Sequence, residues 1–335
     1  MYGKKPTFLR SMYLAADIGG TKTHLALYRK EGDSSSLCYE KKYSSQGASS
    51  LEEIVEAFQK EKPVPIEKAC FAIAGPIVNQ TCKATNLPWE IDASNLEKNL
   101  KIPKVVLIND LEANAYGLRM LRKAQFYEIN KGKAIEGNQA LISAGTGLGE
   151  AGLYFDGKEH IPFASEGGHT DFAPINEEQV RLFEFLRKKN THVSDERVLS
   201  GMGFLNIYDF FLAEGFQEEK EVERAEESEK AKIVTDLAKS KKSEIAEQVV
   251  RLFVQLYAQE AGNVALKYLA VGGVFIGGGI APKILFALKK ESFMQQMSDK
   301  GRFESLLRSM PVKVILEENT ALLGACYFCK NKMKN

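Results

Sequence analysis

The same pattern of an apolar arm, a glycine-containing turn and a second apolar arm occurs twice in this chain. The first copy covers residues 13–28, and the second covers residues 139–155. Glycines supply the reversal in each copy, so each is expected to form two strands joined by a turn. Consecutive peptide N–H groups converge at such a turn, where glycine lets the backbone approach a phosphate closely. Two turns of this kind, facing each other across a cleft, could hold a polyphosphate chain.

Length and composition set the scale of the fold. A chain of 335 residues is long for one hydrophobic core, so we expect two α/β domains with a cleft between them. Its hydrophobic fraction, 44%, and its charged fraction, 27%, are ordinary for a globular protein. The net charge of +1 argues against a broad basic face, and therefore against nucleic acid as a partner.

Membranes and secretion are disfavoured by the distribution of apolar residues. No stretch has the ~20 apolar residues needed to cross a bilayer, and no adequate apolar region for a secretion signal precedes Asp17. The five cysteines are odd in number and scattered, which suits a reducing compartment. Cys326 and Cys329 are expected to pack inside a helix rather than to bind zinc. We therefore expect a cytoplasmic protein without a membrane partner, in which residues 1–11 form an additional tail.

The first glycine turn carries an acidic residue at the end of its leading strand. Asp17 is followed by Gly19, Gly20 and Thr21. A carboxylate there is expected to face Mg²⁺ through water, while Thr21 and the turn amides meet phosphate oxygens. An ordinary hairpin with a polar tip is the alternative. The presence of a second copy favours the phosphate interpretation.

The second turn contains Gly145, Thr146 and Gly147 in the corresponding place. Gly147, Gly149 and Gly152 formally match G-x-G-x-x-G. The dinucleotide fingerprint needs a helix after the turn, however, and the residues that follow here look like a strand. No P-loop motif is present either, so neither the Rossmann nor the P-loop class is expected.

Asn109 and Asp110 follow a short buried strand, residues 105–108, and precede a helical pattern from Leu111 to about Arg122. Functional residues of α/β proteins commonly lie outside the carboxyl ends of strands. Asp110 could accept the proton of an attacking hydroxyl there, or it could merely cap the helix. Asn109 could likewise be a cap or a sugar ligand, and the residues alone leave these alternatives open.

Residues 165–171, SEGGHTD, place polar side chains around two glycines. Glu166 and His169 could present hydrogen bonds to adjacent sugar hydroxyls. A metal site from Glu166, His169 and Asp171 is less favoured because only one histidine is involved, and a structural role for His169 is a further alternative. Glu196 could also bind sugar, although the residues alone favour a simple helix-end charge.

Three further segments complete the pattern. Residues 274–282, VFIGGGIAP, predict a third strand and glycine turn after a helix over residues 244–268. Residues 318–330 predict a C-terminal helix. Residues 216–242 carry a dense mixture of charges, which predicts an exposed helix or a mobile insertion.

Seven segments, in order, resemble those of the bacterial hexokinase-like glucokinase family. They are DIGGTKT from 17, AGP from 74, INDLEA from 108, SAGTGLG from 143, EGGHTDFAP from 166, ERVLSG from 196 and GGVFIGGGIAPK from 272. The resemblance covers nearly the whole chain. The related ROK kinases and repressors share the E-x-G-H segment but normally follow it with a zinc-binding cysteine cluster. No cysteine lies between Cys82 and Cys326 here, which favours the zinc-free glucokinase branch.

The resemblance implies an α/β fold of the two-domain actin-like ATPase (ribonuclease H-like) class, with a sugar and ATP cleft between the domains. That fold also accounts for the repeated hairpins. We expect a small domain of residues 1–119, completed by residues 317–335, and a large domain of residues 120–316. The resemblance further implies a homodimer.

The activity implied is that of a glucokinase, which transfers the γ-phosphoryl group of Mg-ATP to the 6-hydroxyl of glucose. The products would be glucose 6-phosphate and ADP, at the start of glycolysis. The residues implied to hold the sugar are Asn109, Asp110, Glu166, His169 and Glu196, with Asp110 as the base. The residues implied to hold ATP are Asp17, Gly19, Gly20, Thr21, Gly145, Thr146, Gly147, Gly277, Gly278 and Gly279, with Mg²⁺ at Asp17, through water.

Three other functions are less favoured. The first is a kinase for another sugar, such as mannose, N-acetylmannosamine or fructose. The second is a non-catalytic sugar sensor, against which the retention of Asp110 and both glycine turns argues. The third is an actin-like assembly or chaperone ATPase, which would not need the hydroxyl-binding carboxylates. The sequence does not distinguish ATP from polyphosphate as the donor.

Overall fold

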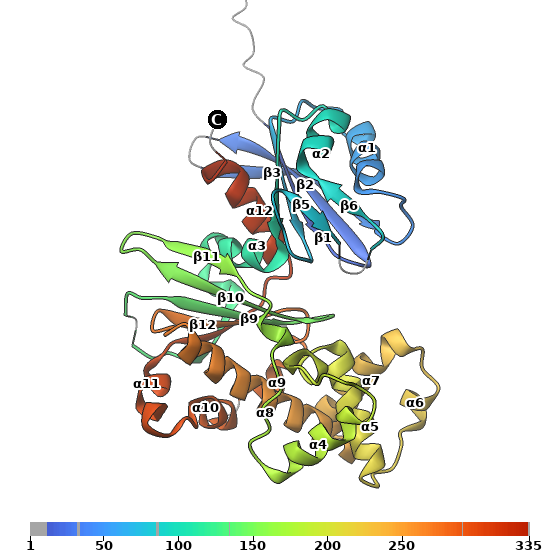
Figure 1. Ribbon diagram of the computed structural model, residues 1–335, viewed down its shortest axis with the longest axis vertical. Helices are drawn as coiled ribbons and strands as arrows, with labels where there is room; N and C mark the ends of the chain where they lie inside the picture. The colour runs from blue at the N-terminus through green and yellow to red at the C-terminus, as the bar shows by residue number, and fades with distance from the viewer. Residues whose placement is uncertain (1–11, 32–33, 85–86, 134, 290, 334–335) are drawn as a thin grey trace, which may run out of the picture. The chain divides into compact units, whose positions relative to one another are not determined.

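The computed structural model describes residues 12–31, 34–84, 87–133, 135–289 and 291–333 (Figure 1). The expected tail, residues 1–11, lies outside the described residues. The chain forms two compact units, of which the first combines Met1–Leu121 with Asn319–Asn335 and the second is Arg122–Glu318. Each unit is built on its own sheet and is described by itself.

A five-stranded sheet forms the centre of the first unit. In spatial order its strands are β3 (Ser34–Ser44), β2 (Lys22–Glu31), β1 (Met12–Ile18), β4 (Lys68–Ile73) and β7 (Lys104–Asn109). β1, β4 and β7 are parallel, and β2 pairs antiparallel with both β1 and β3. The predicted first hairpin is confirmed as β1 and β2. The remaining elements of the unit are α1 (Leu51–Glu61), β5 (Thr81–Lys83), β6 (Glu90–Asp92), α2 (Ala93–Leu100), α3 (Asp110–Gly117), η1 (Leu118–Met120) and α12 (Thr320–Asn331).

Helices cover both faces of this sheet. Successive side chains of a strand point to opposite faces, so alternate residues of β1 enter different hydrophobic clusters. Leu14 and Ile18 belong to the cluster that includes α1 and α2. Tyr13 and Ala15 belong to the cluster that includes α3 and α12. Burial on both faces explains why β1 is apolar along nearly its whole length.

α3 and α12 approach each other closely through small residues. A Cβ atom added at Gly324 would overlap the backbone of Ala113, and one added at Gly117 would overlap the backbone of Thr320. α3 ends at Gly117, before the expected end near Arg122, and a single 3₁₀ turn follows it. The close approach therefore depends on the absence of side chains at the contact.

The C-terminal cysteines support this same face of the sheet. Cys326 and Cys329 are fully buried on α12 within the cluster that also contains Tyr13 and Ala15. Both are free thiols. The packing role predicted for the two cysteines is confirmed.

A six-stranded sheet forms the centre of the second unit. In spatial order its strands are β11 (His160–Ala164), β10 (Leu148–Phe155), β9 (Gln139–Ala144), β12 (Gly273–Gly277), β13 (Val312–Ile315) and β8 (Phe126–Asn130). β9 and β10 form the predicted second hairpin, and β12 runs parallel to β9 and β13. The helical elements are η2 (Lys123–Gln125), η3 (Gly167–His169), α4 (Glu177–Arg187), η4 (Asp195–Arg197), α5 (Gly201–Ala213), α6 (Lys220–Glu223), α7 (Glu227–Ser240), α8 (Glu244–Lys267), α9 (Leu285–Leu288), α10 (Glu291–Ser298), η5 (Gly301–Phe303) and α11 (Glu304–Ser309).

The long helix α8 organises the core of the second unit. Its buried residues join those of β9 and β12 in one hydrophobic cluster, and α5, α7 and α10 contact it along its length (Figure 1). The helix predicted over residues 244–268 is confirmed almost to the residue. It also brings polar residues into the interior, where Gln259 and Glu260 are buried.

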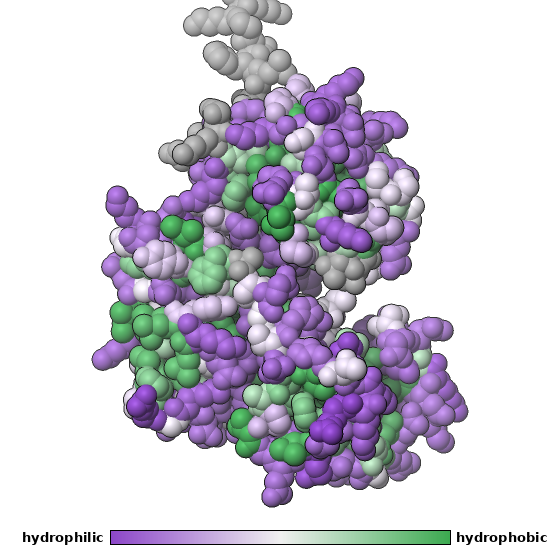
Figure 2. All heavy atoms as spheres, viewed as in Figure 1, coloured by the Kyte–Doolittle hydropathy of each residue, from purple (hydrophilic) through white to green (hydrophobic). Residues whose placement is uncertain are grey.

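The charged segment, residues 216–242, forms α6 and α7. Val222, Val234 and Leu237 are buried in the core of the unit, while hydrophilic residues dominate the surface around these helices (Figure 2). Of the two alternatives stated for this segment, a helix or a mobile insertion, the structure supports the helical one. α6 and α7 are amphipathic and cover part of the core.

Within the described part of the chain, no helix is both long and apolar enough to cross a membrane.

Candidate active site

The first glycine turn connects β1 to β2 and is braced by a residue from outside the hairpin. The amide N–H of Gly19 donates to the carbonyl oxygen of Lys22 at 3.0 Å, which closes the turn. Ser45, just after β3, donates its hydroxyl to the carbonyl oxygen of Gly19 at 2.8 Å and its amide N–H to that of Thr21 at 2.9 Å. Ser45 was not predicted from the sequence, because nothing in its local sequence connects it to a turn between two other strands.

Asp17 lies on β1, immediately before this turn. Burial raises the pKa of Asp17 to about 6, and the charge of Lys42 lowers it in part. A cation beside the carboxylate would favour its ionised form. Mg²⁺ commonly takes one or two carboxylates and fills its remaining positions with water and substrate phosphates. Asp17 therefore fits a Mg²⁺ ion that a nucleotide brings with it.

Asn109 and Asp110 lie at the end of β7, on the same edge of the sheet as the first turn, because β1 and β7 are parallel to the β4 strand between them. The side-chain oxygen of Asn109 accepts from the amides of Leu111 at 2.9 Å and Glu112 at 3.3 Å, which makes Asn109 the cap of α3. Asp110 is the first residue of α3, and its Oδ1 accepts from Leu111 at 3.0 Å. The structure thus assigns the cap to Asn109, and Asp110 is half-buried beside it.

The second glycine turn joins β9 to β10 and is tied to two other elements. The amide of Gly145 donates to the carbonyl oxygen of Gly147 at 2.8 Å. The carbonyl oxygen of Gly145 accepts from the amide of Gly201, at the start of α5, also at 2.8 Å. The amide of Ile280 donates to the carbonyl oxygen of Ala144 at 3.2 Å. This last bond places the loop after β12 beside the second turn.

A buried tyrosine holds the ends of β9 and β12 together. The hydroxyl of Tyr257 donates to the carbonyl oxygen of Gly277 at 3.0 Å and accepts from the amide of Ala144 at 3.1 Å. Gly278 and Gly279 follow as exposed residues, whereas Gly277 is buried. The residues expected to line the adenosine pocket therefore lie at the same carboxyl edge of the second sheet as the second turn.

Glu166, His169 and Glu196 all belong to the second unit, and the last two lie close together. Glu166 precedes η3, His169 ends it, and Glu196 lies within η4. The imidazole Nδ1 of His169 lies 4.0 Å from Oε1 of Glu196, and these side chains are 58% and 23% exposed. The other oxygen of Glu196 accepts from the amide of Leu148 at 2.9 Å. Glu196 therefore supports the second glycine turn, which a simple helix-end charge would not do.

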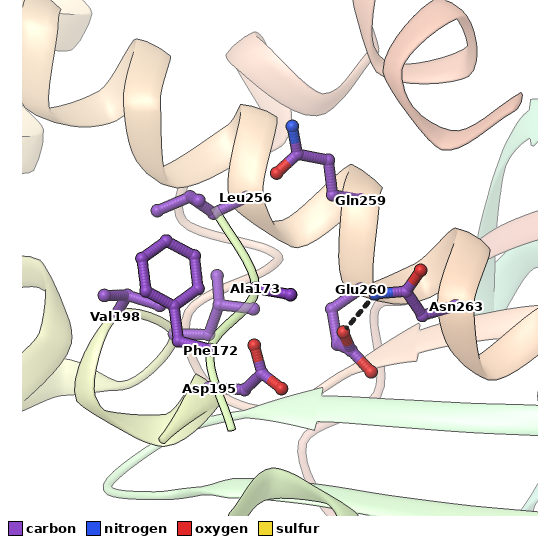
Figure 3. A pocket seen from close by; sticks show the side chains of 9 residues that line it. Phe172, Ala173, Asp195, Val198, Leu256, Gln259, Glu260 and Asn263 are labelled. Atoms are coloured by element: carbon purple, nitrogen blue, oxygen red, sulfur yellow. Dashed lines mark hydrogen bonds between the residues drawn. The ribbon is translucent and has the colours of Figure 1, made fainter. Parts of the chain in front are cut away.

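Three buried carboxyl groups in the second unit were also not predicted from the sequence. Glu150, Asp195 and Glu260 are all buried. Burial, followed by the charge of Glu260, raises the pKa of Glu150 to about 8 and that of Asp195 to about 7. Asp195 and Glu260 line a small cavity, in which Figure 3 shows their carboxyl groups. Nothing in the local sequence connects these three residues with one another, because they come from β10, η4 and α8.

No cluster of three or more His, Cys, Asp or Glu that could hold a metal ion occurs among the residues described. The alternative of a metal at Glu166, His169 and Asp171 gains no support from their arrangement. The imidazole of His192, rather than that of His169, lies 3.3 Å from the carboxylate of Asp171.

Solved structures define the class of this protein. The glucokinase from an Antarctic psychrotroph is 30% identical and superimposes with a TM-score of 0.82 over 96% of this chain and 99% of that chain. A ROK family glucokinase from Streptomyces griseus, solved with glucose and AMPPNP, shares the fold at 17% identity and a TM-score of 0.65, over 96% and 99% of the two chains. The chain is a sugar kinase with the actin-like ATPase fold.

Sequence comparison gives the family within that class. The family model for glucokinase matches residues 14–332. A glucokinase of Nostoc punctiforme is 41% identical, over 94% of this chain and 98% of its own length. One from Shigella dysenteriae is 35% identical, over 93% and 95%. The chain belongs to the glucokinase family.

Proposed function

We propose that this protein transfers the γ-phosphoryl group of Mg-ATP to the 6-hydroxyl of glucose, giving glucose 6-phosphate and ADP. One observation carries the proposal beyond family membership. A single edge of the first sheet presents both a braced glycine turn with Asp17 and a second carboxylate, Asp110, whose helix is already capped by Asn109. A phosphate site and a carboxylate able to accept a proton are what transfer to a hydroxyl requires.

The donor side of the proposal assigns the two glycine turns and the loop after β12 to the nucleotide. The N–H groups of Gly19 and Gly145 close the two turns, so those of Gly20 and Thr21 and of Thr146 and Gly147 would meet phosphate oxygens. Gly278 and Gly279, which lack side chains and are exposed, would leave room for the adenosine. Asp17 would hold Mg²⁺ through water, and Mg²⁺ would neutralise charge on the transferring phosphoryl group.

The acceptor side assigns the sugar hydroxyls to polar side chains. Glu166, His169 and Glu196 would hydrogen-bond hydroxyl groups, and Asn109 would add its amide. The side-chain N–H of Asn109 donates to the carbonyl oxygen of Gly75 at 3.2 Å, so its orientation is fixed before any ligand arrives. Each of these groups, if left unpaired by a sugar of the wrong stereochemistry, would cost binding free energy.

Asp110 would act as the base. In a loose transition state the hydroxyl keeps its proton until the phosphoryl group is largely transferred. A carboxylate of ordinary basicity then suffices, because it accepts the proton late. A base placed in this way typically contributes ~10²- to 10⁴-fold to the rate.

We also propose a cellular location, a pathway and an oligomeric state. The enzyme would work in the cytoplasm as the first enzyme of glycolysis, and it would form a homodimer.

The experiment is a product assay with a panel of acceptors. Purified protein is mixed with Mg-ATP and glucose, mannose, fructose or N-acetylmannosamine, and ADP and sugar phosphate are quantified. We expect the highest kcat/KM with glucose and glucose 6-phosphate as the product. A higher kcat/KM with any other acceptor would contradict the assignment of glucose.

A further inference from the structure

The buried carboxyl group of Glu150 lies directly beneath η3. Glu150 is 1% exposed, on β10. A Cβ atom added at Gly167 would overlap the Glu150 carboxyl group, so the two residues touch only because Gly167 has no side chain. The backbone supports the same contact, since Ser165 donates its hydroxyl to the carbonyl oxygen of Glu150 at 2.9 Å and accepts from the amide of Gly167 at 3.2 Å. Glu150 therefore underlies the segment that carries Glu166 and His169.

Asp195 makes a second connection to the same segment. The hydroxyl of Thr170 donates to Oδ2 of Asp195 at 3.2 Å, and the amide of Asp195 donates to the carbonyl oxygen of Thr170 at 3.0 Å. Asp195 directly precedes Glu196, whose carboxylate is held by the amide of Leu148 on β10. β10, η3 and η4 are thus joined to one another around Glu150 and Asp195.

Glu260, on α8, is the member of the group that has hydrogen-bond donors beside it. Its Oε1 lies 3.1 Å from Nζ of Lys267, and its Oε2 accepts from the side chain of Asn263 at 2.7 Å (Figure 3). Both oxygens of Glu260 are therefore engaged with donors. Lys300 also approaches, since its Nζ donates to the side-chain oxygen of Asn263 at 2.7 Å.

Glu150 is in the opposite situation. Neither oxygen of its carboxyl group has a hydrogen-bonding partner among the described residues. A buried carboxylate without a donor is costly, and such a group takes up a proton instead. Burial, followed by the charge of Glu260, raises the pKa of Glu150 to about 8. A protonated Glu150 can donate to Glu260, and that hydrogen bond raises the pKa in the same direction.

A small cavity adjoins the group on the side of α8. It has a volume of about 10 Å³, enough for about one water molecule, and its polar lining comes from Asp195, Gln259, Glu260 and Asn263. The Nε2 of Gln259 is buried and without a partner among the described residues. A single water molecule there could connect Gln259 to Asp195. Glu150 does not line the cavity, so this water would not donate a hydrogen bond to an ionised Glu150.

The charges around Glu150 and Asp195 do not balance once both are ionised. Lys267, from α8, lowers the pKa of Glu150 by its charge, and Lys300, from the loop after α10, acts mainly on Glu260. The titratable or charged groups that face Glu150 and Asp195 from neighbouring elements are Asp171, Tyr257, Glu260 and Lys267.

We propose that Glu150 and Asp195 are positioning residues for sugar binding, and that a proton held between Glu150 and Glu260 keeps η3 and η4 fixed on β10. Loss of that proton places an unpaired negative charge beside two other buried carboxyl groups. Movement of η3 away from Glu150 relieves the repulsion. The affinity for glucose therefore falls as the pH rises through about 8. The inference rests on the assignment of Glu166, His169 and Glu196 to the sugar.

The test is calorimetric titration of glucose into the full-length protein at about pH 7, 8 and 9. Buffers of different ionisation enthalpy report how many protons are taken up on binding. We expect glucose to bind about fivefold or more weakly at the highest pH than at the lowest. We also expect binding to take up protons near the middle of the range. Glu150→Gln keeps the shape of a protonated carboxyl group, so its affinity should be independent of pH and its binding should take up no proton. Glu184→Gln, an exposed Glu on α4, should behave as the wild type does.

Wild-type affinity that is constant over this range, or binding without proton uptake, would overturn the inference. So would a Glu150→Gln variant that retains the wild-type pH dependence. If Glu150→Gln does not fold, the proton uptake measured for the wild type still tests the inference. Asp195→Asn, which keeps an acceptor for Thr170, should alter the pH dependence of glucose affinity.

A further variant separates this inference from the proposed function. Glu166→Gln should weaken glucose binding at every pH. If it leaves the affinity unchanged, the assignment of the sugar site is wrong. If it weakens binding and the wild-type affinity is still independent of pH, only the role of Glu150 and Asp195 is wrong.

Discussion

Asn109 and Asp110 are adjacent residues of similar shape, but they have different structural roles. Asn109 caps α3 with its side-chain oxygen. Asp110 begins the helix with a carboxylate at the carboxyl edge of the sheet. A cap position favours Asn and Asp almost equally, so the sequence could not tell which of the two was the cap. Only the backbone geometry at the end of β7 distinguishes them.

Glu196 allows a test of the proposed sugar site at the level of one residue. Glu196→Gln keeps an oxygen that can accept from the amide of Leu148, so the fold should be preserved. It removes the negative charge, and a hydrogen bond to a charged group contributes about 1.5–3 kcal/mol. We expect KM for glucose to rise about tenfold or more, with a smaller change in kcat.

Steady-state kinetics at saturating ATP measure this effect, with Glu184→Gln as the matched control. An unchanged KM for glucose in Glu196→Gln would mean that Glu196 serves only the second glycine turn.

The elements show more clearly what a sequence can predict. Both hairpins, the strand before Asn109, the long helix α8 and the C-terminal helix follow from apolar periodicity and from the places of glycine. Ser45 and Glu150 could not be predicted in the same way. Ser45 follows β3 and braces the turn that leads into the neighbouring strand β2, and Glu150 interrupts a strand whose other inward residues are apolar. Long-range contacts of this kind depend on packing that no local pattern records.

The contact between α3 and α12 gives a prediction at this scale. Gly324→Ala places a methyl group against the backbone of Ala113, and overpacking of a closely packed contact typically costs about 1–3 kcal/mol. We expect a lower free energy of unfolding for the variant, measured by denaturant titration. Gly47→Ala is the matched control, because a Cβ atom there would meet only the Ser44 side chain at 3.8 Å or more. Equal stability of the two variants would show that α12 can shift on α3 without cost.

At the scale of the whole molecule, stability should depend on pH through the buried carboxyl groups. Burial raises the pKa of Glu150 to about 8 and that of Asp195 to about 7, whereas both titrate near pH 4 in an unfolded chain. Between these values the folded protein holds protons that the unfolded chain has lost. The stabilisation is complete below about pH 4 and is lost as the pH rises to about 8, by at most roughly 1.4 kcal/mol per pH unit for each group.

Glu150→Gln removes one of these titrations. Its free energy of unfolding should therefore fall less between about pH 5 and pH 8 than that of the wild type. Chemical denaturation at several pH values measures the difference. Parallel pH profiles for the two proteins would show that Glu150 is not protonated in the folded state.

The proposed mechanism depends on Asp110, which would accept the proton when glucose is phosphorylated. The most direct measurement compares Asp110→Asn with the wild type, using glucose-dependent ADP release for kcat and calorimetry for glucose affinity. Asp236→Asn, an exposed change on α7, is the control. We predict that Asp110→Asn lowers kcat by ~10²- to 10⁴-fold while glucose still binds. Turnover close to that of the wild type would contradict the account.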